Sequence, residues 1–131
     1  VLGHPPASGE IDGYLAHHKK SSGKMRVVSG AGPGALRAVT RFEKLQEVGA
    51  FALLRVTIRT GVTHQIRCQL AAQGHPVVGD RVYGGPSSPA LPARHFLHAA
   101  ELIFRQPATG APRHLEAPLP RELAALLQHG V

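Results

Sequence analysis

The sequence has a single cysteine, Cys68, and no tryptophan. One cysteine cannot form a disulfide within the chain, so the disulfide-stapled class of small secreted domains is excluded and a reducing compartment is favoured. No apolar run reaches the roughly 18 residues that a membrane-spanning helix needs. The opening residues, V-L-G-H-P-P, show neither the basic leader nor the apolar stretch of a signal peptide. These absences predict a cytoplasmic protein.

Acidic residues are also scarce. Eight Asp and Glu stand against 15 Lys and Arg, which gives a formal net charge of +7. Most of the basic residues are arginine, whose planar fork suits phosphate groups. A field of this sign attracts nucleic acid or an anionic membrane without distinguishing the two. Hydrophobic residues make up 43% of the chain, which is enough for a modest core, so we expect a folded domain rather than a disordered chain.

Hydrophobic patterning predicts a mostly antiparallel sheet. Alternating or β-branched residues predict three longer strands, at 35–45, 51–59 and 96–104. Shorter strands are expected at 11–15, 25–28 and 113–117. Gly49 is expected to make the turn of a hairpin between the first two long strands. Segments rich in Gly, Pro and Ser predict loops at 29–34, 74–85 and 86–92.

Two helices are predicted. Thr63 is expected to cap the first, over 64–73, with Ile66 and Leu70 facing the core. The second is expected to begin at Pro120. The side chains expected to dock it on the sheet are three leucines, Leu123, Leu126 and Leu127. The fold class is therefore α+β, a mostly antiparallel sheet with one central helix and one C-terminal helix.

The densest motif lies at 59–84, R-T-G-V-T-H-Q-I-R-C-Q-L-A-A-Q-G-H-P-V-V-G-D-R-V-Y-G. It resembles the signature of the RluA-like pseudouridine synthases, T-G-R-T-H-Q-I-R-x-H-L followed by G-H-P-x-x-G-D-x-x-Y-G. Residues 96–104 are similar to that family's L-H-A-x-x-L-x-F strand, and residues 115–120, L-E-A-P-L-P, to its closing segment. The resemblance covers nearly the whole chain. It implies isomerisation of uridine to pseudouridine in ribosomal or transfer RNA, without a metal or an organic cofactor.

The family's catalytic aspartate, which sits in an H-R-L-D type motif, has no counterpart in this sequence. The two aspartates present, Asp12 and Asp80, match other segments of the family pattern, G-x-I-D and G-D-x-x-Y-G. The family's tyrosine that packs beside the target base would fall just before Val1. The resemblance thus implies that residues 1–131 are the C-terminal portion of a pseudouridine synthase catalytic domain, inactive without the N-terminal portion. Val62 stands where the family usually has an arginine.

The resemblance also implies roles for individual residues. Arg67, the arginine of H-Q-I-R, would hold the catalytic carboxylate with its bidentate fork and keep it ionised. Leu97 would lie against the flipped target base, and can serve as a core leucine as well. His64 and Gln65, which the resemblance places among the RNA-binding residues, either organise the backbone near the pocket or make local hydrogen bonds at the helix start. The remaining motif residues look structural, with tight turns at the glycines and amide capping by the aspartate: Gly79, Asp80, Tyr83 and Gly84.

A basic face is predicted to touch RNA phosphates, although an ordinary solvated face has the same composition. Its members are Lys19, Lys20, Lys24, Arg26, Arg37 and Arg41. Such contacts would position RNA without reading its sequence. The sequence has nine histidines, but His95 and His98 would point to opposite faces of a strand, and no ligand-spaced cluster exists. We therefore expect RNA as the partner, and no metal, cofactor or membrane.

Two rival hypotheses remain open. The chain could be a non-catalytic RNA-binding remnant that kept the basic surface, which predicts salt-dependent RNA binding. It could also be a fragment without an independent role, because half a sheet leaves an unpaired strand edge.

Overall fold

The computed structural model describes residues 1–20 and 23–130. Over these residues the elements are, in order, β1 (Ser8–His17), β2 (Met25–Val28), β3 (Leu36–Val48), β4 (Phe51–Ile58), α1 (Gln65–Ala72), β5 (Glu101–Arg105), β6 (Pro112–Glu116) and α2 (Arg121–His129). All paired strands are antiparallel. The predicted α+β class is confirmed.

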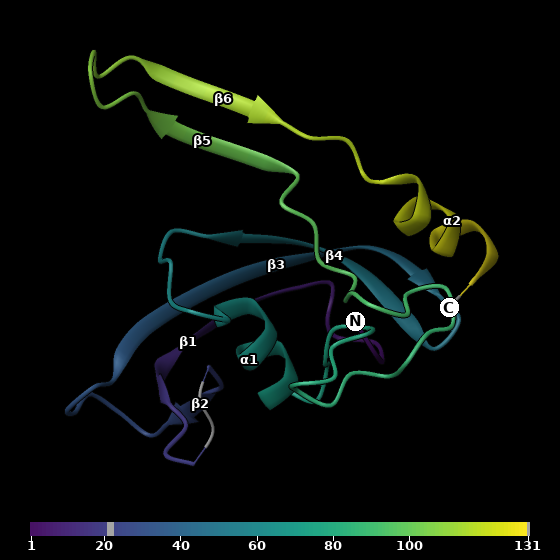
Figure 1. Ribbon diagram of the computed structural model, residues 1–131, viewed down its shortest axis with the longest axis horizontal. Coiled ribbons are helices and arrows are strands. Elements are labelled where there is room, and N and C mark those ends of the chain that lie inside the picture. Colours follow the sequence, from purple (N-terminus) through teal and green to yellow (C-terminus); the bar gives the residue numbers. More distant parts are fainter. Residues whose placement is uncertain (21–22, 131) are drawn as a thin grey trace.

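The strands form two separate sheets. A four-stranded sheet has the order β2-β1-β3-β4, and β5 pairs with β6 in a two-stranded ribbon. Figure 1 shows α1 lying against the four-stranded sheet and the ribbon standing away from it. The turn between β3 and β4 occupies residues 49–50, with Gly49 at a φ of 59°, so the hairpin predicted there is confirmed. Neither helix of the described residues is long and apolar enough to cross a membrane.

Two predictions were wrong, the start of one strand and the capping residue of one helix. The strand expected over 96–104 begins only at Glu101. The preceding residues are held elsewhere, because the Phe96 amide donates to the Val78 carbonyl at 2.8 Å and the Phe96 side chain packs in a loop-side core. Thr63 does not cap α1. His64 occupies the N-cap position instead. Its backbone is left-handed, with a φ of 54°, and its side chain makes no capping hydrogen bond.

The face that α1 buries is more polar than predicted. Its buried residues include Gln65 and Gln69, whereas Ile66 is only half-buried. Gln69 accepts a hydrogen bond from the Thr40 hydroxyl at 2.6 Å and donates to the Ala38 carbonyl at 2.9 Å. Gln65 donates to the Thr40 hydroxyl at 3.1 Å and accepts from Thr60 at 2.9 Å. The two amides therefore fasten α1 to β3, and burying them is tolerable because they are hydrogen-bonded.

Replacing Gln69 with leucine is expected to lower the free energy of unfolding by about 1–3 kcal/mol, since the buried Ala38 carbonyl would lose this donor and the Thr40 hydroxyl, still bonded to Gln65, would lose its acceptor. Urea denaturation measures the change. Gln46→Leu is the matched control, because Gln46 is exposed on β3. Equal effects of the two substitutions would mean that the buried network does not stabilise the fold.

A second core lies beneath α2. Leu123 and Leu126 are buried against Val78 and Leu91 of the preceding loops. The predicted docking on the sheet holds only in part: Phe51 of β4 packs against this cluster, while the other residues around the two leucines lie in loops. Leu127, which was also expected to dock, is only half-buried.

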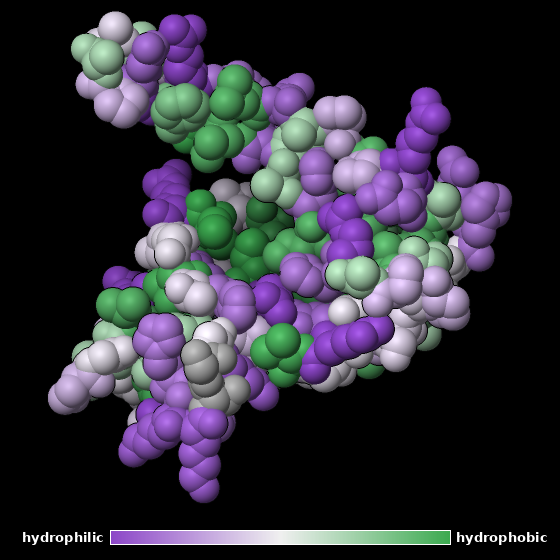
Figure 2. All heavy atoms as spheres, viewed as in Figure 1, coloured by the Kyte–Doolittle hydropathy of each residue, from purple (hydrophilic) through white to green (hydrophobic). Residues whose placement is uncertain are grey.

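The ribbon has no core of its own. Every residue of β5 and β6 is exposed, including Leu102, Ile103 and Leu115, and Ile103 is 69% exposed. Figure 2 shows apolar side chains gathered on the side of the ribbon that faces the rest of the chain. Such a ribbon is marginal in isolation, because two strands without packing bury little apolar area.

Candidate functional site

The first turn of α1 and the loop at 79–85 meet around the ring of Tyr83. The guanidinium carbon of Arg67 lies 5.2 Å from the ring centroid and Lys24 Nζ lies 5.7 Å from it. The His64 ring meets Tyr83 edge-on, with centroids 5.6 Å apart. Cations near an aromatic face are attracted by its quadrupole. The structure therefore brings Lys24, His64 and Arg67, three of the predicted site residues, to one aromatic platform.

Arg67 already has a carboxylate partner within this chain. Its Nε donates to Asp80 Oδ2 at 2.6 Å and its Nη2 to Oδ1 at 2.9 Å. The Asp80 side chain is 0% exposed and that of Arg67 is 14% exposed. Both bonds use one edge of the guanidinium, and the Nη1 side is not part of the pair. The fork is thus fixed in one pose, and Nη1 makes no hydrogen bond within the described residues.

Asp80 also holds the turn that carries it. Its Oδ1 accepts the amides of Val82 at 3.1 Å and Tyr83 at 3.3 Å, which confirms the predicted capping. Burial alone would raise the pKa of Asp80, but the hydrogen bonds and charge of Arg67, with the two amides, hold that pKa below its ordinary value. The aspartate is therefore ionised at neutral pH, and so is Arg67, whose pKa is raised by the hydrogen bond to Asp80.

His64 is held in a neutral form. Burial, and then the charge of Arg67, lower the pKa of its imidazole. Its Nδ1 lies 2.9 Å from the Tyr83 hydroxyl, which accepts the Met25 amide at 2.9 Å. Burial raises the pKa of Tyr83, so the hydroxyl keeps its proton. A Tyr83 hydroxyl that donates to Nδ1 leaves the imidazole proton on Nε2.

Two glycines allow the turn to pack against backbone. Gly79 has a φ of 80°, and a Cβ there would lie 2.5 Å from the Arg94 carbonyl oxygen. A Cβ at Gly85 would lie 1.9 Å from the Val77 carbonyl oxygen. Any side chain at either position would push the turn away, and with it the carboxylate that orients Arg67.

Other predicted site residues lie elsewhere or are occupied. Gln65 is 2% exposed and its amide donates to the Val39 carbonyl at 3.0 Å, so it lies inside the protein. Its predicted role toward RNA remains a prediction. Leu97 is half-buried outside any strand, and its carbonyl accepts a hydrogen bond from Arg94 at 3.3 Å. Its role toward a flipped base remains a prediction.

The predicted basic face is divided. Arg37 pairs with Asp12 at 2.6 Å, and Arg41 pairs with Glu10 across the same two strands. Arg26 lies on β2 with a buried Nε that has no partner among the described residues. Lys19 and Lys20 are exposed, while residues 21–22 of the basic turn lie outside the described residues. Both predicted basic residues of β3 are therefore paired with carboxylates of β1.

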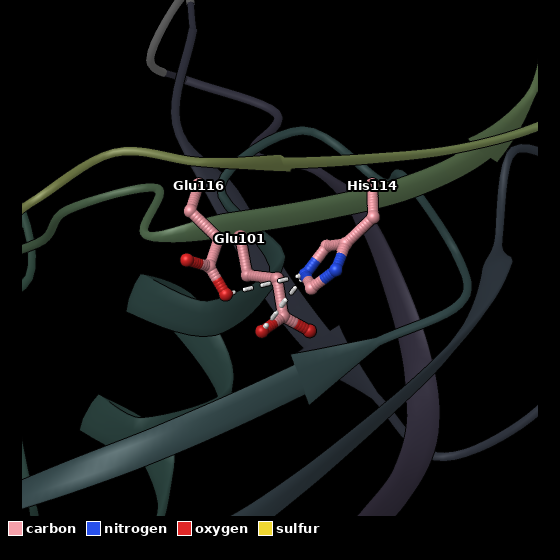
Figure 3. Close-up of side chains that lie close together, drawn as sticks. All are labelled: Glu101, His114 and Glu116. Atoms are coloured by element: carbon pink, nitrogen blue, oxygen red, sulfur yellow. Dashed lines mark ion pairs between the residues drawn. The ribbon is translucent and has the colours of Figure 1, made fainter.

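One side-chain cluster was missed by sequence reasoning. Glu101, His114 and Glu116 project from the same face of the ribbon, because Glu101 pairs with Glu116 across the strands and His114 lies two residues away (Figure 3). His114 Nε2 lies 3.4 Å from Glu101 and 3.5 Å from Glu116. These groups could hold a metal ion, yet all three are exposed. The strand register brings these three side chains together, and that register cannot be read from the sequence.

The chain is similar to a set of RNA-modifying proteins. A sequence model of the family described as RNA pseudouridylate synthase matches residues 2–72. A protein of Chloroflexus aurantiacus named as an uncharacterized RNA pseudouridine synthase is 39% identical over 128 residues, which are 98% of this chain and 39% of that protein. The ribosomal large subunit pseudouridine synthase D of Escherichia coli is 32% identical over an alignment of 140 positions that covers 98% of this chain and 42% of that protein.

A solved structure agrees. The human RNA pseudouridylate synthase domain containing 1 superposes with a TM-score of 0.74 and 26% identity, over 91% of this chain and 51% of that one. The chain therefore spans about two fifths of the length of the curated relatives it matches.

Proposed function

This chain belongs to the RNA pseudouridylate synthase family, and we propose that it is the C-terminal portion of a catalytic domain that converts uridine to pseudouridine in RNA. The observation that supports this most directly is the Arg67 fork, which Asp80 holds through Nε and Nη2 while Nη1 makes no hydrogen bond within the described residues. The catalytic carboxylate comes from the N-terminal portion of the domain. The name of the E. coli relative favours ribosomal RNA of the large subunit as the substrate.

The reaction breaks the glycosidic C–N bond, rotates the uracil and rejoins it through carbon. The uridine must leave its stack to reach the site. A carboxylate that approaches Nη1 of Arg67 stays ionised because a fixed cation stabilises its charged form. That ionised form is required whether the carboxylate attacks the ribose or removes a proton. Because Asp80 holds Arg67 beforehand, no reorganisation is needed when the carboxylate arrives. The proposed reaction needs no metal or cofactor, and the proposed location is the cytoplasm.

An additional strand can pair along the outer edge of β4, where Val1 already pairs. Val1 and Ala52 exchange two backbone hydrogen bonds, of 2.8 and 3.0 Å, in antiparallel pairing. A residue preceding Val1 would lie opposite Leu53, along β4. Burial lowers the pKa of the Val1 amine to about 6, and a peptide N–H at this position would make the same bond without a charge to desolvate.

The size of the native protein tests this proposal. An antibody against this chain, used on lysate of the source cells, is expected to detect a band well above 13.9 kDa. The protein of that size should form pseudouridine in RNA, and the 131-residue chain alone should not. A band at 13.9 kDa, or isomerase activity of the 131-residue chain, would contradict the half-domain proposal.

A non-catalytic RNA-binding protein is the second candidate, favoured by the net charge of +7. It requires a native mass of 13.9 kDa together with RNA binding that weakens as salt is raised.

A further inference from the structure

A hollow of about 190 Å³ opens beside Arg67, between the loop at 79–82 and the segment at 92–95. Its walls are tied together. The Phe96 amide donates to the Val78 carbonyl at 2.8 Å, and Gly79 packs directly on the Arg94 carbonyl. The hollow is therefore part of the packed structure and does not depend on two independent loops.

Three arginines line the hollow, and they differ in how their charge is compensated. Arg67 is paired with Asp80, and Arg94 with Glu122 at 2.8 Å. Arg81 donates to the Pro92 carbonyl at 2.8 Å, which is a neutral acceptor. Within residues 1–20 and 23–130, no carboxylate lies within salt-bridge distance of Arg81. The positive charge of Arg81 is thus uncompensated while its guanidinium is still oriented.

His95 also lines the hollow. Burial, and then the charge of Arg67, lower the pKa of its imidazole, so it is neutral at pH 7. It adds hydrogen-bonding capacity without charge. The lining thus combines one free cation, two oriented guanidiniums and a neutral imidazole, and its only carboxylate, Asp80, is fully used by Arg67 and by backbone amides.

We propose that this hollow is a phosphate-binding site, in which Arg81 and Arg94 hold a backbone phosphate of RNA beside the nucleotide presented to Arg67. The RNA assignment rests on the proposed function. Arginine forks match phosphate oxygens in geometry, and a phosphodiester carries one negative charge, which would balance the uncompensated positive charge of Arg81. None of the residues predicted from the sequence to touch RNA lies in this site. The contact fixes the position of the strand and does not read its sequence.

Salt-dependent binding tests the RNA part. The protein that includes the aspartate-bearing portion is titrated with a uridine-containing RNA stem-loop at several salt concentrations, and binding is followed by fluorescence anisotropy. Arg81→Ala is expected to reduce the slope of log K against log salt by about 0.7–1, the share of one phosphate contact. Arg81→Lys should keep the slope and weaken affinity. Arg113→Ala is the matched control, because Arg113 is also exposed and bonded to a neutral acceptor, Gln106 Oε1, at 2.8 Å.

Inorganic phosphate separates the site from the substrate. In a phosphate titration followed by ¹⁵N NMR, the Nε–H signal of Arg81 is expected to shift saturably and that of Arg113 is not. Absence of that shift overturns the inference whether or not RNA binds. A saturable shift with equal salt slopes for Arg81→Ala and Arg113→Ala would assign the hollow to a free phosphate compound and overturn the RNA contact. A saturable shift without any RNA binding would leave the phosphate site and remove the proposed function.

Discussion

Replacing Asp80 with alanine is expected to lower the free energy of unfolding by about 3–5 kcal/mol. The substitution leaves the Arg67 guanidinium, 14% exposed, without its partner. It also removes the acceptor of the Val82 and Tyr83 amides. Small domains are stable by only about 5–15 kcal/mol, so the loss would be a large part of the total. Urea denaturation followed by tyrosine fluorescence gives the change.

Asp12→Ala is the matched control for this measurement. Asp12 makes the same two-bond contact with Arg37, at 2.6 and 2.9 Å, but both side chains are exposed. Its removal is expected to leave the urea midpoint nearly unchanged, because exposed pairs are screened by solvent. Similar losses in both variants would mean that burial is not what makes the Asp80 pair matter.

Acid provides a second readout for Asp80. Because its folded pKa lies below the ordinary value, its contribution is present above the unfolded pKa of about 3.9 and is lost as the pH falls through the folded pKa. The difference in stability between the wild-type chain and Asp80→Ala should therefore narrow as the pH falls below about 4.

Arg67→Ala is expected to lower kcat for pseudouridine formation about 10²–10³-fold in the enzyme that includes the aspartate-bearing portion. The loss follows because the carboxylate would have no fixed cation to keep it ionised and in one pose. Initial rates on a large-subunit ribosomal RNA transcript measure it. Arg67→Lys keeps the charge but loses the fork, so it should restore only part of the rate.

Two controls separate catalysis from folding. Arg67→Ala also leaves Asp80 buried without its partner, so rates must be compared at a temperature at which both proteins are fully folded. Arg55→Ala removes an equal charge from an exposed pair on β4 and should keep the wild-type rate. Wild-type kcat in folded Arg67→Ala would exclude Arg67 from the reaction.

The strands of the four-stranded sheet could be predicted from the sequence, because alternation survives where a strand packs on one side. The alternating hydrophobic pattern predicted a strand start at Phe96 that was wrong, because the Phe96 side chain packs in a core formed with residues of distant loops. The helix α1 was predicted with the wrong buried face, because polar residues normally point outward. A signal was present: Gln65 and Gln69 are one helical turn apart, and both meet a threonine at the centre of β3.

The sequence predicted which residues belong to the candidate site, but not how they are arranged. Motif resemblance selected Arg67 and His64, and turn chemistry assigned a capping role to Asp80. Pairing between Arg67 and Asp80, 13 residues apart, depends on how the loop folds back on the helix. The Arg81 hollow depends on a packing of two loops for which the sequence carries no period. Tertiary geometry of this kind is fixed by contacts between distant residues, which local patterns do not record.

The exposed ribbon means that this chain should not unfold as one cooperative unit. Within the described residues, β5 and β6 pair only with each other and bury none of their residues. Local opening of the ribbon therefore costs far less than unfolding the body, by which we mean the four-stranded sheet with α1 and the loops packed on it. Both tyrosines, Tyr14 and Tyr83, belong to the body. A tyrosine-detected transition therefore reports the stability of the body alone, and amide exchange in the ribbon would be fast while the body is still native.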